Sequence, residues 1–122
     1  MDELVDRVVA KVGVERSLAE KSIGIIFDFL SKEGPTEQVH ALLDRLPGAN
    51  EAIAAARAGD SSGTFGTMGG VMGVGSRLMS AGLGLSEIQG VTREIIAYAR
   101  EKAGDEQINA IVNAIPGLSQ FI

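Results

Sequence analysis

The chain contains one stretch twice, at a constant spacing of 69 residues. Residues 37–53 read EQVHALLDRLPGANEAI, and residues 106–122 read EQINAIVNAIPGLSQFI. Each copy has apolar residues at helical spacing and then reaches a Pro-Gly pair. A proline disfavours the helical conformation in the residue before it. The sequence therefore predicts two helices that end in the same way in two halves of the chain.

The similarity extends upstream of these stretches, so that residues 13–53 align with residues 82–122 without a gap. Nine of the 41 aligned pairs are identical, whereas this composition would give roughly three by chance. Any two amphipathic helices with similar loops would also look alike. However, the helix starts and both Pro-Gly stops fall in register, which favours a duplication.

Apolar periodicity predicts an all-α fold. Residues 18–30 are apolar on more than one face, which is typical of a buried central helix. Gly24 lies inside this helix and predicts a close approach of another helix, since glycine otherwise weakens a helix by about 1 kcal/mol. We expect helices over residues 2–12, 17–33, 37–46, 51–58, the end of 59–75 up to Gly82, 86–104, and 106–115.

Polar residues before the apolar runs predict the helix starts. Ser17 with Glu20 and Ser86 with Gln89 match the spacing of the capping box, in which two side chains satisfy free N–H groups. Caps are predicted in the same way for the remaining helices at Thr36, Asn50 and Asp105.

We expect one all-α domain over residues 1–122, made of two tandem helical repeats of about three helices each and packed as one bundle around two central apolar helices. The first repeat covers 1–58, a Gly/Ser-rich connection covers 59–70, and the second repeat covers 71–122. A unit of about 50 residues is marginal alone. The halves should therefore bury their central helices against each other, and the connection would also allow two chains to exchange halves.

Composition excludes several classes of function. The net charge is −5 and neither half is basic, which argues against nucleic acid because phosphate binding needs clustered Lys and Arg. The chain has no Trp for base stacking and no Cys for disulfides or thiolate chemistry. The first residues are acidic, unlike a secretory signal. We therefore predict a cytoplasmic protein.

No catalytic arrangement is visible in the sequence. His40 is the single histidine and is expected to form an exposed pair with Asp44. We predict a non-enzymatic protein without cofactor or metal. The alternative, an enzyme, would need a polar cleft, for which the candidates are Arg93, Glu94 and Tyr98.

Seven of the seventeen residues in 59–75 are glycine, and the apolar residues that accompany and follow them are the best candidates for an interaction surface. The candidate surface comprises Met68, Val71, Met72, Leu78 and Met79. The first hypothesis is self-association as a homodimer, or association with another protein. The second is a small apolar ligand or lipid held between helices, because Met adapts to irregular apolar surfaces. Binding to a membrane surface is disfavoured, because anionic lipids would repel the chain.

The second half, with GLGLSEIQGV followed by an apolar helix, a GDEQ cap and a final IPG, resembles small all-helical bacterial domains of unknown function of the VcgC/VcgE-like kind. The resemblance covers residues 69–122 best and extends to the first half through the repeat. It implies a bacterial source and an all-α fold. It carries over no catalytic or binding residue.

Overall fold

The computed structural model describes residues 2–46, 48–59 and 70–115, with the side chains of 57–59 and 70–72 left out. Within these ranges the chain forms seven helices and no strand, so the all-α prediction is confirmed. The helices are α1 (Asp2–Val12), α2 (Arg16–Glu33), α3 (Thr36–Asp44), α4 (Ala49–Gly59), α5 (Gly70–Ala81), α6 (Leu85–Ala103) and α7 (Asp105–Ala114).

Helix α2 lies at the centre of the molecule. Every residue from Ser22 to Leu30 is buried, as the apolar pattern predicts, and the helix packs against α1, α3, α4, α5 and α6. At Gly24 the backbone of α4 comes so close that a Cβ atom would lie 2.9 Å from the carbonyl carbon of Ala52. The predicted close helix crossing at Gly24 is therefore confirmed.

The predicted capping residues are wrong for several helices. Helix α2 begins at Arg16 and α6 at Leu85, so Ser17 and Ser86 lie inside the first turn, where their hydroxyls are past the capping position. The N-terminus of α6 is instead satisfied when the N–H of Gly84 donates to Glu87 Oε1 at 2.9 Å.

The other three predicted caps are displaced in the same direction. Helices α3 and α7 begin one residue earlier than expected, and α4 begins two residues earlier, so the three residues predicted to cap them are already helical. Sequence patterns locate helix ends only to within one or two residues. The residues concerned are Thr36, Asn50 and Asp105.

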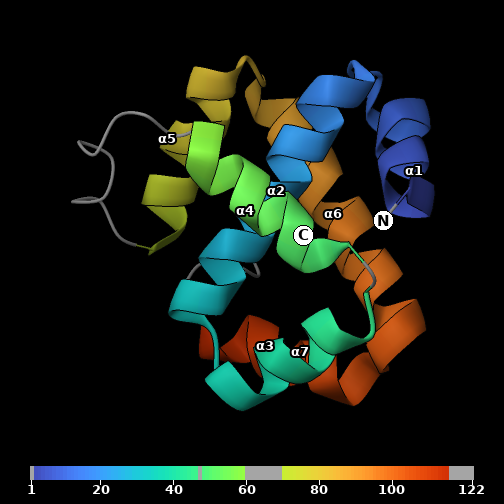
Figure 1. The fold of residues 1–122 in the computed structure, drawn as a ribbon, viewed down its shortest axis with the longest axis vertical. Coiled ribbons are helices and arrows are strands. Elements are labelled where there is room, and N and C mark those ends of the chain that lie inside the picture. Colours follow the sequence, from blue (N-terminus) through green and yellow to red (C-terminus); the bar gives the residue numbers. More distant parts are fainter. Residues whose placement is uncertain (1, 47, 60–69, 116–122) are drawn as a thin grey trace.

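The first helix of each half contacts both central helices, and its contact with the central helix of the other half is the more extensive one. Helix α1 lies against α6, and α5 lies against α2. The turns after α1 and α5 lie at one end of the molecule, and α3 and α7 lie side by side at the other end (Figure 1).

The helix bounds repeat at the spacing seen in the sequence. Shifted by 69 residues, α1, α2 and α3 would cover 71–81, 85–102 and 105–113, which agrees within one residue with α5, α6 and α7. The turns after α1 and α5 both use a glycine in the left-handed region, Gly13 with φ 84° and Gly82 with φ 112°. Side chains other than glycine rarely adopt this conformation.

Candidate functional site

The predicted interaction surface is only partly described by the structure. Met68 lies outside the described residues, and for Val71 and Met72 the structure describes the helix but not the side chains. Leu78 is 1% exposed, so this member of the predicted surface belongs to the core, on the inner side of α5. Met79, one position further around the helix, is 54% exposed.

Met79 has an exposed apolar neighbour across the turn between α5 and α6. Leu85, the first residue of α6, is 58% exposed, and these two are the exposed large apolar side chains among the residues whose burial is described. We call Met79, Leu85 and the turn between them the α5–α6 corner. No charged residue occurs from position 78 to position 86.

The corner has a defined backbone. Leu83 is buried, and its N–H donates to the Leu78 carbonyl at 3.1 Å. Gly82 donates to Met79 at 3.0 Å and takes the positive φ that ends α5. The buried Leu83 therefore fixes the turn, and Met79 and Leu85 lie exposed on either side of it.

The equivalent corner of the first half is charged. Arg16 occupies the position equivalent to Leu85, 69 residues earlier, and its guanidinium contacts Asp6 at 2.6 Å, Asp2 at 3.4 Å and Glu20 at 3.5 Å. The hydrogen bond to Asp6 raises the pKa of Arg16 above its ordinary value. The corner of the first half thus holds the ion pairs of Arg16, whereas the α5–α6 corner is apolar.

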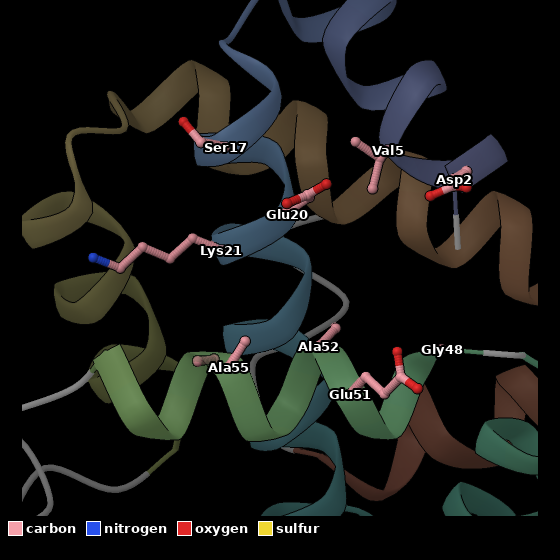
Figure 2. Close-up of a pocket in the computed structure, with 10 residues that line it drawn as sticks. Asp2, Val5, Ser17, Glu20, Lys21, Gly48, Glu51, Ala52 and Ala55 are labelled. Atoms are coloured by element: carbon pink, nitrogen blue, oxygen red, sulfur yellow. The ribbon is translucent and has the colours of Figure 1, made fainter.

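A groove with a volume of about 720 Å³ lies between α1, α2 and α4 (Figure 2). Small side chains of α4 line one wall, and carboxylates stand around the rim. The lining residues are Asp2, Val5, Ser17, Glu20, Lys21, Gly48, Glu51, Ala52, Ala55 and Ala56. This volume is in the range of ligand pockets.

A second hollow, of about 700 Å³, lies where α3 meets α7. It is lined by both copies of the repeated Glu-Gln pair, Glu37-Gln38 and Glu106-Gln107. Gln107 Nε2 donates to the Gln38 carbonyl at 3.0 Å, so two residues 69 positions apart touch directly. Neither this hollow nor the groove includes a residue of the Gly/Met-rich segment, so the hypothesis of an apolar ligand there stays a prediction.

Asp28 is a buried acid that the sequence reasoning missed. It is 0% exposed and pairs with Arg77 of α5 at 3.1 Å and with Lys32 at 3.4 Å. The sequence contained a signal for this buried acid, because Asp28 is the one charged residue in the apolar run IIFDFL. A buried carboxylate must be paired to be tolerated, and this pair joins α2 to α5.

The cleft considered around Arg93, Glu94 and Tyr98 is a helix contact. Arg7 of α1 lies 5.7 Å from the centroid of the buried Tyr98 ring and pairs with Glu94 at 3.4 Å and with Glu101 at 2.5 Å. The hydrogen bond to Glu101 raises the pKa of Arg7, although burial acts against it. Arg93 lies apart from this cluster, exposed on the outer side of α6.

Three further findings bear on the type of site. No group of three or more His, Cys, Asp or Glu side chains that could hold a metal lies within the described ranges. His40 and Asp44 are both exposed, and no ion pair between them is present. No helix in the described part of the chain is long and apolar enough to cross a membrane.

Comparisons of this chain with models of protein families, with curated proteins and with solved structures found no significant match. The resemblance to VcgC/VcgE-like domains therefore stays an expectation from the sequence.

Proposed function

We propose that this chain is a non-enzymatic helical module that associates with a second copy of itself through the α5–α6 corner. The observation that carries the proposal is the exposure of Met79 and Leu85, at 54% and 58%, beside a turn whose backbone is fixed. Exposed large apolar side chains on the two sides of one turn favour association, because burial removes their surface from water.

A second copy suits the corner because of charge. Each chain carries a net charge of −5, so two copies repel each other at most contact surfaces. Positions 78–86 carry no charge, and contact there brings few like charges together. Association with a different protein is the alternative, and the solution mass of the pure chain distinguishes the two.

We further propose that the fold is a duplication, with α1–α3 repeated as α5–α7. The agreement of helix bounds after a shift of 69 residues supports this, as do the equivalent glycine turns. The exchanged packing of α1 on α6 and α5 on α2 has the form expected of a two-fold dimer fused into one chain.

The proposal predicts that Met79→Ser and Leu85→Ser each weaken self-association. Both side chains are exposed, so the free energy of unfolding should change by about 0.5 kcal/mol or less. Sedimentation equilibrium over a dilution series measures the association constant, and urea unfolding measures stability. Ala10→Ser is the matched control, because Ala10 is exposed at the position of the charged corner that corresponds to Met79.

We expect the control to associate like the unmodified chain. Association that is unchanged in both corner variants would contradict the proposed surface.

A further inference from the structure

The groove between α1, α2 and α4 is hollow because its α4 wall is built from small residues. Because Gly24 has no side chain, the backbone of α4 packs directly against α2. The short side chains of Ala52, Ala55 and Ala56 line the groove without filling it. The α4 wall runs from Gly48 to Ala56, which is about 12 Å of helix. It can therefore take about two turns of another helix.

The rim of this groove is acidic. Three acidic residues from three different helices line it, namely Asp2, Glu20 and Glu51. The lining contains one basic residue, Lys21. Arg16 already engages Asp2 and Glu20, whereas no ion pair of Glu51 is present among the described residues. Figure 2 shows Lys21 at one end of the groove, and Asp2 and Glu51 toward the other.

The same chain carries a helix face that matches this pattern. Leu85, Gln89 and Arg93 occur at intervals of four residues on α6, so they lie on one side of the helix. Leu85 and Arg93 are exposed, and Gln89 is half-buried. The face thus combines an apolar end with a cationic end about 12 Å apart.

We propose that the groove receives the Leu85–Arg93 face of α6 from a second copy. Leu85 packs on the exposed Ala55 of the α4 wall, and Arg93 pairs with Glu51 at the acidic end. This inference rests on the proposed self-association and names the surface that meets the α5–α6 corner. Complementary charge at the two surfaces gives the contact its orientation.

A charge exchange tests the contact. Glu51→Lys and Arg93→Glu should each weaken self-association about tenfold or more, because each places like charges together. The double variant, Glu51→Lys with Arg93→Glu, restores an opposite pair and should return the association constant to within about threefold of the unmodified value. Sedimentation equilibrium at one ionic strength measures all three.

Asp44→Lys and Arg45→Glu are matched controls, since they make the same charge changes on exposed residues at the end of α3. Helix α3 lies at the other end of the molecule from the α5–α6 corner (Figure 1). Both controls should associate like the unmodified chain. Far-ultraviolet circular dichroism and urea unfolding verify that every variant is folded.

The outcomes separate the two proposals. If Leu85→Ser weakens association but Glu51→Lys does not, self-association through the corner stands and the groove is not its counterpart. If the double variant is weaker than both single variants, Glu51 and Arg93 do not meet, and the inference is overturned. If the unmodified chain does not associate, the proposed function itself fails.

Discussion

Gly24 is the residue on which the position of α4 depends most. A Cβ at this position would meet the carbonyl group of Ala52, which is backbone and has little freedom to move. We predict that Gly24→Ala lowers the free energy of unfolding by about 1–3 kcal/mol, because the strain exceeds the gain in helix propensity. Urea unfolding measures the change.

Gly75→Ala is the matched control. Gly75 also lies inside a helix, but no atom lies within 4 Å of an added Cβ. This variant should gain up to about 1 kcal/mol from helix propensity alone. Equal effects of the two substitutions would show that the helix crossing at Gly24 is not tight.

At the scale of single residues, predictions from the sequence were correct where one physical requirement explains why a residue type occurs at its position. A glycine inside an apolar helix predicted a close crossing, and the structure confirms it. The capping serines failed, because Ser17 and Ser86 fit the spacing while the helices start one residue earlier. Leu85 was missed for the same reason, since the predicted start at Ser86 placed it outside the helix.

At the scale of helices, an arginine pairs across each exchanged contact. Arg77 of α5 reaches the fully buried Asp28 of α2, and Arg7 of α1 reaches Glu101 of α6, whose side chain is 58% exposed. We predict that Asp28→Asn costs about 3–5 kcal/mol of stability, because it removes the buried negative charge with which Arg77 and Lys32 pair. Glu101→Gln should cost about 1 kcal/mol or less.

Urea unfolding of the two variants, at low and at moderate salt, measures this difference. Salt should reduce the effect of Glu101→Gln more, since exposed pairs are screened. A cost for Asp28→Asn no larger than that for Glu101→Gln would contradict the role given to the buried pair.

The helices themselves could largely be predicted, because their apolar periodicity is strong. The expected helix over residues 2–12 matches α1, and the predicted burial of the second helix matches α2. Their partners could not be predicted. Residues 1–12 could have packed on the central helix of either half. Periodicity shows which face of a helix is apolar, but it does not show which other helix that face contacts.

At the scale of the whole molecule, the exchanged packing makes the halves depend on each other. Removing α1 from α6, or α5 from α2, would open the core of both halves. We therefore predict a single cooperative unfolding transition. Far-ultraviolet circular dichroism follows all helices, and fluorescence of Tyr98, the only tyrosine, follows the contact of α1 with α6.

The two probes should give coincident urea transitions. Two separate midpoints would mean that the halves unfold independently, contrary to the exchanged arrangement. From the sequence we expected the central helices of the two halves to pack on each other, and we did not predict that α1 lies on α6 and α5 on α2. Similarity between two segments does not show which segment supplies each packing partner.

The groove also lay beyond sequence reasoning. It depends on where α1, α2 and α4 diverge, and its lining comes from three separate segments of the chain. The signal for the corner was present, as a run of uncharged residues from 78 to 86 in a chain where 22% of residues are charged. Only the structure separates exposed Met79 from buried Leu78 within that run.

The molar mass of this chain in solution shows whether it associates with itself. Light scattering on the pure, unmodified chain should give twice the chain mass of 12.7 kDa at high concentration, with a fall toward the monomer on dilution. Met79→Ser combined with Leu85→Ser should shift that fall to higher concentration. A mass of one chain at every concentration would contradict self-association.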